Sequence, residues 1–509
     1  MSALNFKRNV LASYAGQIYV TLISIVMVPV YLRYLGSEAY GLVGFFAMLQ
    51  AWFQLLDMGL TPTMARETAR CGDSDSEALG LRRLLRALEG IFIAIAVLGG
   101  ALVAGGADLI AGKWLKVEHL AHSDVRHALM LMGVIVALRW VSGLYRGAIN
   151  GFERIVWLNG FNILVATARF VLVIPYFIFY SIGLVDFFWF QLGVALLELV
   201  PLVVQTYRIL PAIPAGQRVP WQWGPLRGVL GFSVSIAFTS SVWVLVTQTD
   251  KLILSRLLPL TDYGYFTLAV LIASGVMVIS GPISAALLPR LTRLAAQHDD
   301  PALIRLYRRA TQMVAVISVP AAIVLAFFAE QVLTAWTGNA EIGRKAAPVL
   351  ALYAIGNGFL GLGAFAYYLQ FAKGNLRLHL IGSGLFLTLL IPSLVWATLH
   401  YGVTGAAYAW AGANVAYFAL WVPVVHRRLA PGLHMDWLLR DVAPIACASM
   451  LAAALLDHSL HWPQARALAG AQIALVSLAL LAVAALSSGA VREIIGGKWR
   501  ARFAVKEAV

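Results

Sequence analysis

The chain is a succession of long apolar stretches separated by short polar connections. A bilayer-spanning helix needs roughly 20 apolar residues, and fourteen segments approach that length. They lie near residues 10–32, 40–61, 88–111, 127–147, 159–182, 185–206, 228–254, 262–287, 313–334, 346–370, 379–399, 404–425, 442–457 and 467–487. None shows the alternation over about 10 residues that is typical of membrane β-barrel strands. The pattern predicts an all-α polytopic membrane protein with about 14 transmembrane helices.

Composition agrees with this class and gives the orientation. Of the 509 residues 61% are hydrophobic and 12% are charged. The net charge of +14 comes mainly from Lys and Arg residues in the connections between spans. Basic residues in these positions indicate how the chain is oriented in the membrane rather than nucleic-acid binding. Of the 38 Lys and Arg residues, 27 lie in connections on the side of the N-terminus, 8 lie on the opposite side and 3 lie within spans. The positive-inside rule therefore predicts that both termini are cytoplasmic.

Several residues of the first half of the chain also recur in the second half at a nearly constant offset. Arg8 corresponds to Arg227, Tyr40-Gly41 to Tyr263-Gly264, and Pro62 to Pro289, with offsets of 219, 223 and 227 residues. The first and seventh segments run in the same direction, so the halves form a parallel repeat of six spans. The expected organisation is an N-terminal six-helix bundle (1–206), a cytoplasmic linker (207–226), a C-terminal six-helix bundle (227–425), two additional transmembrane helices (426–487) and a basic cytoplasmic tail (488–509).

Two basic connections are predicted to form short amphipathic helices on the membrane surface. They are residues 76–88 and 301–310. Their basic faces would rest on anionic lipid, which makes membrane lipids expected partners.

Motifs of enzymatic chemistry are missing from the sequence. It contains no glycine-rich phosphate loop, no HExxH, no Gly-x-Ser-x-Gly and no paired Cys or His at metal spacing, and His119/His122 is a weak metal signal. The two cysteines, Cys71 and Cys447, do not suggest a disulfide framework. We therefore expect no catalytic residue, no metal and no cofactor, and a protein that is not an enzyme.

Two arginines lie deep inside predicted spans. Arg139 is roughly 18 Å from the outer end of its helix and Arg169 roughly 15 Å from the inner end of the next, at 1.5 Å per residue. Both therefore lie near the middle of a core roughly 30 Å thick, where a charge facing lipid is costly. Guanidinium groups can clamp phosphate through two parallel hydrogen bonds. The arginines are predicted to line a wet cationic cavity, or else to pair with Glu198 or Asp57.

Other polar residues in spans are weaker candidates. Polar stripes on the helices could either form a cavity wall or mediate helix–helix packing, and they include Gln17, Asn162 and Gln248. Lys251 is a third cationic candidate, although near the outer interface it could also reach the headgroups without a function. The carboxylates Asp57, Asp250 and Glu198 are candidates for ion coupling.

The motifs at the start of the chain resemble those of Wzx-type polysaccharide flippases. These belong to the multidrug/oligosaccharidyl-lipid/polysaccharide (MOP) exporter superfamily. The resemblance covers about residues 1–430 and includes the loop LLPRLTRLAAQHDDPALIRLYRRA. The matching residues are Leu35, Gly36, Tyr40, Gly41, Leu56, Asp57, Gly59 and Leu60, and later Gln248, Asp250 and Lys251.

The resemblance implies both a fold and a function. The fold would be a V-shaped MOP/MATE-like arrangement of two six-helix bundles with two extra C-terminal helices. The function would be secondary-active flipping of an undecaprenyl-pyrophosphate-linked glycan, such as an O-antigen, exopolysaccharide or capsule repeat unit, from the cytoplasmic to the periplasmic leaflet of a bacterial inner membrane. Transport would use alternating access, driven by an H+ or Na+ gradient or by membrane potential. A polysaccharide polymerase and chain-length machinery would be partners. Cationic residues line the cavity in this family, and Arg139, Arg169 and Lys251 are predicted for that role from depth and facing.

Three alternatives remain open from the sequence. A cation or drug antiporter of the same superfamily should have an acid-rich cavity, whereas the deepest charges here are arginines. A lipid II flippase fits the first-helix pattern less well. A membrane glycan polymerase or glycosyltransferase should carry a sizeable periplasmic loop with clustered charges, and the sequence has none.

Overall fold

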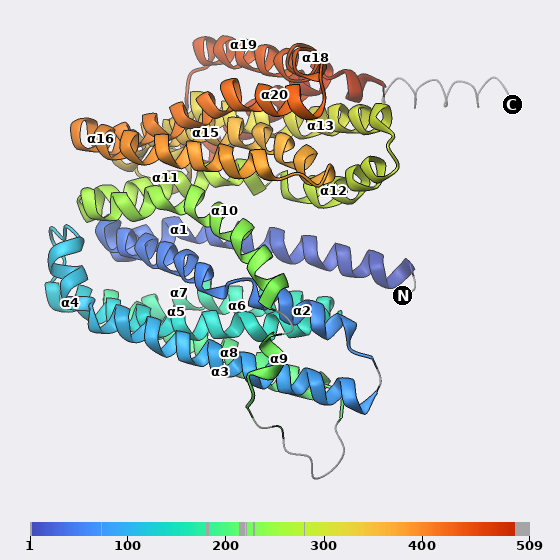
Figure 1. Ribbon diagram of the computed structural model, residues 1–509. Coiled ribbons are helices and arrows are strands. Elements are labelled where there is room, and N and C mark those ends of the chain that lie inside the picture. Colours follow the sequence, from blue (N-terminus) through green and yellow to red (C-terminus); the bar gives the residue numbers. More distant parts are fainter. Residues whose placement is uncertain are drawn as a thin grey trace, which may run out of the picture. The chain divides into compact units, whose positions relative to one another are not determined.

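The protein is helical throughout the part that its computed structural model describes (Figure 1). That part is residues 3–493 except 73, 180–182, 213–218, 220, 228–229 and 279; the side chains of 3–11, 230–232, 234–240 and 280–286 are also outside it. These residues form no strand, and they divide into two compact units, Met1–Gly264 and Tyr265–Val509. The all-α class is confirmed. The expected bundle boundaries at 206 and 227 stay a prediction, and most of the basic tail lies outside the described residues.

Eleven helical stretches in the described ranges are long and apolar enough to cross a membrane. Two of them, Ala12–Asp57 and Arg377–Leu429, each contain two of the expected segments. The backbone turns within them at Gly36 (φ 82°) and Gly402 (φ 61°), a left-handed region that glycine adopts readily. A polytopic membrane protein is therefore confirmed, while the count of fourteen spans stays a prediction.

The first unit is built around a central helix, α5. Its helices are α1 (Ala3–Phe53), η1 (Gln54–Asp57), α2 (Leu60–Arg70), α3 (Asp75–Gly105), α4 (Ala107–Leu109), η2 (Ile110–Trp114), α5 (His122–Gly151), α6 (Ile155–Phe170), α7 (Val173–Phe179), α8 (Leu184–Ile209), α9 (Gly224–Arg227), α10 (Leu230–Leu257) and the start of α11 (Leu260–Val278). Helix α5 packs against α2, α3 and α8. A Cβ on Gly133 would lie 2.8 Å from the carbonyl oxygen of Gly100, and one on Gly147 would lie 2.7 Å from that of Thr61. Glycine thus lets these helices approach closely, as is common in membranes.

The repeated Tyr-Gly pairs meet in the first unit. A Cβ on Gly41 would collide with the carbonyl oxygen of Leu260, and one on Gly264 would collide with that of Ser37. Each hypothetical Cβ would also lie 3.2 Å from the backbone nitrogen of the other glycine. Corresponding positions of the repeat therefore form one close helix crossing, which requires glycine on both sides.

A loop before α5 is fixed by a buried carboxylate. Glu38 accepts hydrogen bonds from the backbone N–H groups of Glu118 (2.6 Å) and His119 (3.0 Å). Lys116 binds the other side of the loop to the end of α10, because its Nζ donates to the carbonyl of Leu257 at 2.7 Å. The loop thus links α1 to α10.

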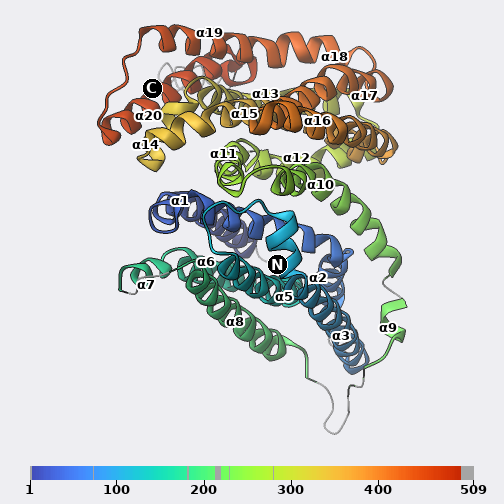
Figure 2. The same cartoon turned by 90° about the vertical axis from the view of Figure 1, so that its left-hand side faces the viewer.

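The second unit is organised around α13. Its helices are the rest of α11, α12 (Ser280–Ala296), α13 (Asp300–Phe327), α14 (Ala329–Thr337), α15 (Ala340–Ala372), α16 (Arg377–Ala416), η3 (Tyr417–Trp421), α17 (Val422–Leu429), α18 (Leu433–Asp436), η4 (Trp437–Val442), α19 (Ala443–Ser459) and α20 (Arg466–Ser487). Helix α13 packs against α12, α15, α19 and α20 (Figure 2). Its core holds the fully buried rings of Tyr307 and Trp437.

The two expected surface helices are not separate elements. Residues 76–88 and 301–310 are the first turns of α3 and α13, each continuous with a span. Each helix begins at a side-chain cap: Ser74 Oγ accepts from the Glu77 N–H (3.3 Å), and Asp299 Oδ1 accepts from the Ala302 N–H (3.0 Å). The prediction of short surface helices is therefore wrong, because nothing interrupts the helix between the basic turns and the apolar part.

Candidate functional site

A cluster of charged side chains lies among four helices of the first unit. Arg139 and Arg146 project from α5, two helical turns apart and therefore on the same face. Arg169 lies at the end of α6, and Glu198 lies on α8. We call these four residues the central cluster.

Arg139 is held by amide side chains on both sides. Its Nη1 donates to Gln50 Oε1 on α1 (3.0 Å), and its Nη2 donates to Gln191 Oε1 on α8 (3.1 Å). Its Nε lies 3.9 Å from a carboxylate oxygen of Glu198, and its guanidinium carbon lies 5.5 Å from the ring centroid of Phe46. With only 9% of its side chain exposed, Arg139 is a well-anchored buried cation.

Arg146 makes the direct ion pair of the cluster. Its Nη2 donates to Glu198 Oε1 at 2.7 Å, and its Nη1 donates to the side-chain oxygen of Asn162 on α6. Its side chain is 27% exposed, whereas that of Glu198 is 10% exposed. Arg146 is thus the more accessible partner of a carboxylate that it shares with Arg139.

The backbone of Arg169 is fixed by two hydrogen bonds, while its guanidinium packs over the ring of Phe170. The hydroxyl of Tyr31 and the amide Nε2 of Gln191 both donate to its carbonyl oxygen, at 3.3 and 3.2 Å. The guanidinium carbon lies 5.1 Å from the ring centroid of Phe170. Within the described ranges, the guanidinium has no hydrogen bond and no ion pair, although it is attracted electrostatically by Glu198.

The charges of the central cluster do not balance. The cluster holds three guanidinium groups and one carboxylate, Glu198, which contacts Arg139 and Arg146 but not Arg169 within the described residues. The four side chains therefore sum to two positive charges, in a region where each unpaired charge is costly. A purely structural network would be expected to neutralise itself. An excess of guanidinium groups can instead bind an anion, and phosphate in particular, through charge-assisted hydrogen bonds.

Several predicted residues come together in this cluster. Arg139, Arg169 and Glu198 belong to it, and Asn162 contacts it through Arg146. The predicted alternative, pairing of an arginine with Glu198, is also observed for Arg139. Asp57 has another position: it accepts from the N–H (3.1 Å) and hydroxyl (2.5 Å) of Thr61 and so caps α2.

The other predicted residues lie elsewhere on α10 and α1. Lys251 folds back on its own helix, where its Nζ donates to the carbonyl of Thr247 and lies 3.5 Å from Asp250 Oδ1. Gln248 donates weakly to the Thr247 hydroxyl (3.4 Å), and Gln17 is exposed. The cavity roles of Lys251, Gln248 and Gln17, and the coupling roles of Asp57, Asp250 and Glu198, stay predictions.

Sequence reasoning missed three members of the site. Gln50 and Gln191 are amides inside apolar helices, which is a signal in itself because a buried amide needs partners. Arg146 was not proposed as a site residue because it lies at the cytoplasmic end of its predicted span, although its helical spacing from Arg139 already placed it on the same face.

The fold and the central cluster define a polytopic helical membrane protein with a buried excess of positive charge. In the part of the chain that the structure describes, no group of three or more His, Cys, Asp or Glu residues is placed to hold a metal ion. The chain belongs to the polysaccharide biosynthesis protein family, whose family model matches residues 6–295.

Individual relatives agree with this membership. A Shigella flexneri protein named "Putative O-antigen transporter" is 21% identical over 391 residues, which are 77% of this chain and 90% of the relative. The lipid II flippase MurJ in an inward closed conformation is similar in fold, with a TM-score of 0.67, 13% identity and coverage of 92% of this chain and 97% of its own. An inward-facing MATE transporter of the MOP superfamily gives a TM-score of 0.65 at 13% identity, covering 81% and 94%. Family and fold together place the chain among transporters rather than enzymes.

Proposed function

We propose that this protein is a flippase for a polyprenyl-pyrophosphate-linked oligosaccharide, most simply an undecaprenyl-pyrophosphate-linked repeat unit of an O-antigen, exopolysaccharide or capsule. It moves this lipid from the cytoplasmic to the periplasmic leaflet of the inner membrane. The observation that carries the proposal is the central cluster, in which Arg139 and Arg146 share one carboxylate and the guanidinium of Arg169 has no hydrogen bond or ion pair in the described part of the chain.

The chemistry of the cargo suits this cluster. A pyrophosphate is anionic and a glycan is strongly hydrated, so neither crosses hydrocarbon unaided. In the proposed mechanism Arg169 binds the phosphate oxygens, and the partly exposed Arg146 exchanges part of its contact with Glu198 for a contact with the anion. Arg139 keeps α1, α5 and α8 together while this occurs. Alternating access of the two halves then releases the headgroup on the other side.

The sign of the charge separates this proposal from its main rival. An antiporter for cationic drugs requires a surplus of carboxylates at the binding site, whereas the central cluster has a surplus of guanidinium groups. A proton or sodium gradient can still drive the cycle, and Glu198 is then the candidate coupling group because it is buried between two arginines.

The test is translocation by the purified protein in liposomes. A fluorescent polyprenyl-pyrophosphate oligosaccharide is placed in one leaflet, and its transfer is followed with and without an imposed membrane potential. We expect Arg169→Gln to reduce the transfer rate by at least tenfold, since a charged hydrogen bond is worth about 1.5–3 kcal/mol. Retention of the rate by the variant would contradict the assigned site.

A matched control is available on α5. Arg126 pairs with Asp108 at 3.1 Å at the start of the helix, with 44% of its side chain exposed, and it lies outside the central cluster. Arg126→Gln removes the same charge and should leave transfer unchanged. Proton-driven efflux of organic cations without glycolipid transfer would favour the antiporter instead.

A further inference from the structure

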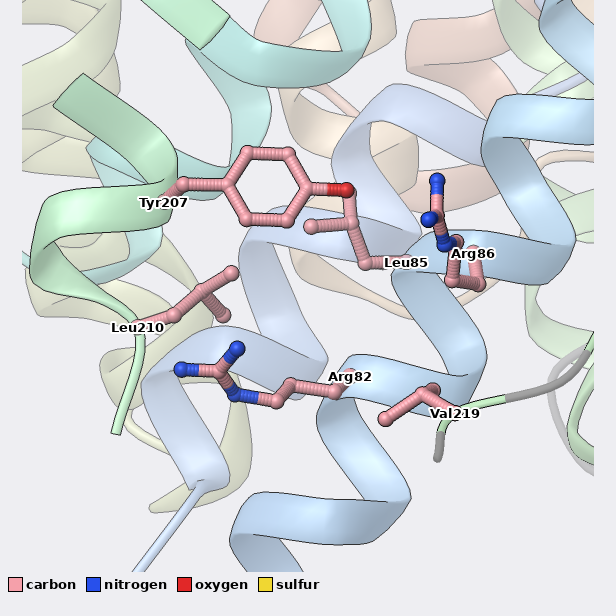
Figure 3. Close-up of a pocket in the computed structure, with 6 residues that line it drawn as sticks. All are labelled: Arg82, Leu85, Arg86, Tyr207, Leu210 and Val219. Carbon is pink, nitrogen blue, oxygen red and sulfur yellow. The ribbon is translucent and has the colours of Figure 1, made fainter. Parts of the chain in front are cut away.

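A cationic pocket separate from the central cluster lies in the first unit, where α3 approaches the end of α8 (Figure 3). Its volume is about 230 Å³, room for several water molecules at ~30 Å³ each. Arg82, Leu85 and Arg86 line it from α3, Tyr207 and Leu210 from the end of α8, and Val219 from the connection that follows. Figure 3 shows the guanidinium of Arg82 extending from α3 towards Leu210. The pocket shares no residue with the central cluster.

The arginines of this pocket keep donors available. Arg82 uses its Nε to donate to the carbonyl of Pro211 (2.9 Å), which orients the side chain and leaves both Nη groups for a ligand. Arg86 lies 3.3 Å from Glu89 Oε2 through one Nη, and 58% of its side chain is exposed. Figure 3 shows the two guanidinium groups pointing in different directions, with Leu85 between them, so Arg82 offers its donors to an anion while Arg86 adds positive charge to the same pocket.

The carboxylate behind the pocket is already saturated. Glu89 is buried and accepts from the hydroxyls of Tyr145 (2.9 Å) and Tyr207 (2.8 and 3.0 Å) as well as from Arg86. Its charge is therefore spread over three donors. It positions Tyr207 and Arg86 rather than competing for Arg82, and one positive charge remains in excess.

The pocket lies at the level of lipid headgroups. The last 20 residues of α3, from Arg86 to Gly105, suffice to cross a hydrocarbon core that requires roughly 20 residues. Arg82 and Arg86 therefore lie at the edge of the hydrocarbon. Trp221 and Trp223 support this level: they are 44% and 60% exposed, and the indole of Trp221 donates to the carbonyl of Ala87 at 3.3 Å. Exposed tryptophans are typical of the membrane interface.

We infer that this pocket binds the phosphate group of an anionic membrane phospholipid. The guanidinium of Arg82 binds the phosphate oxygens, Arg86 contributes positive charge, and the acyl chains lie along the apolar part of α3, where Ile93 and Val97 are more than half exposed. Because Arg82 also holds Pro211 and Trp221 contacts α3, the bound lipid stabilises the start of the connection between α8 and α10 against α3.

The experiment measures the dissociation constant for dioleoylphosphatidylglycerol. The full-length protein in neutral detergent is titrated with this lipid, and bound copies are counted by native mass spectrometry, with dioleoylphosphatidylcholine as the zwitterionic reference. We expect one high-affinity site for phosphatidylglycerol. Its affinity should fall by about tenfold or more in Arg82→Gln, the effect of one lost charged hydrogen bond. Arg82→Lys keeps the positive charge but loses the paired Nη donors of the guanidinium, so an intermediate loss of affinity is expected.

Two comparisons decide the assignment. Arg70→Gln removes an exposed arginine at the end of α2, where its side chain is 63% exposed, and it should bind the lipid as the wild type does. Equal affinity of the wild type, Arg82→Gln and Arg82→Lys would overturn the site. Inorganic phosphate tests whether the ligand is a free anion rather than a lipid. If phosphate stabilises the wild type against heat and phosphatidylglycerol does not, the pocket binds a free anion and the lipid assignment is wrong.

Discussion

The two units of the molecule each contain a buried polar cluster, but the charges in them are arranged differently. In the second unit Asp441 is 1% exposed and is matched to one cation, since Arg308 donates to it twice, at 2.6 and 3.1 Å. The Nε2 of Gln312 also donates a hydrogen bond to Asp441, at 2.6 Å, and the Oε1 of Gln312 accepts one from the Ser488 hydroxyl at 2.9 Å. In the first unit Glu198 is shared by Arg139 and Arg146, while Arg169 is left over.

The difference separates a balanced structural cluster from the cluster that we propose as a binding site. The cluster of the second unit joins α13 to η4 and to the residues after α20, and each of its charges has its counterpart. It needs no ligand to be stable. The central cluster of the first unit holds three guanidinium groups and one carboxylate, a surplus that suits the anionic cargo we propose. Burial alone would not distinguish the two clusters, whereas the count of charges does.

Removal of Glu198 should have the largest effect on stability. In Glu198→Ala Arg139 and Arg146 lose their shared carboxylate, and breaking a buried pair in this way costs about 3–5 kcal/mol. The free energy of unfolding in detergent, measured by denaturant titration, should fall by this amount. Additional removal of Arg146 should restore part of the loss, because it lowers the repulsion that remains.

The control for this variant is a surface pair. Glu341 lies 2.9 Å from Lys345 with both side chains at least half exposed, and Glu341→Ala should leave the unfolding transition where it is. If Glu198→Ala behaved like this surface variant, Glu198 would not be compensating the arginines.

A smaller effect is expected in the second unit. Asp441→Asn keeps one carbonyl acceptor, and Arg308 can turn to water because 28% of its side chain is exposed. The loss should be about 1.5–3 kcal/mol, the value of a hydrogen bond to a charged group. Arg308→Gln should cost a similar amount, and the double variant should cost less than the sum. Strict additivity would contradict a closed, matched pair.

Much of this fold was predictable from the sequence because a bilayer simplifies the problem. Long apolar runs can only be helices there, so the all-α polytopic class followed directly. The deep positions of Arg139 and Arg169 were also sufficient to propose a cationic site. The left-handed backbone at Gly36 and Gly402, which kinks each of these long helical stretches, could not be foreseen, because a glycine in an apolar run gives no sign of its φ angle.

The partners of the site were harder to predict than its position. The sequence indicated two possible acids for the arginines, and only tertiary packing selects Glu198 while Asp57 caps α2. The contacts of Lys251 were likewise not predictable, because its side chain turns back along α10 to the carbonyl of Thr247, while its cavity role stays a prediction. Side-chain direction depends on helix rotation, and amphipathic patterns fix this rotation poorly when both lipid and protein faces are apolar.

The smallest effect on stability should come from the residue that we expect to matter most for transport. Arg169 contributes its carbonyl oxygen to the packing of α6 against Tyr31 and Gln191, and a glutamine at this position retains that carbonyl. The guanidinium has no hydrogen bond or ion pair in the described structure, so Arg169→Gln should change the free energy of unfolding by at most about 0.5 kcal/mol. Arg139→Gln, which loses contacts to Gln50 and Gln191, should be clearly less stable in the same denaturant titration.

If Arg169→Gln unfolds as readily as Arg139→Gln, the third guanidinium is part of the structural network and the surplus charge is not reserved for a cargo. If it is as stable as the wild type yet fails to transfer the glycolipid, the imbalance between the two clusters is the property on which transport depends.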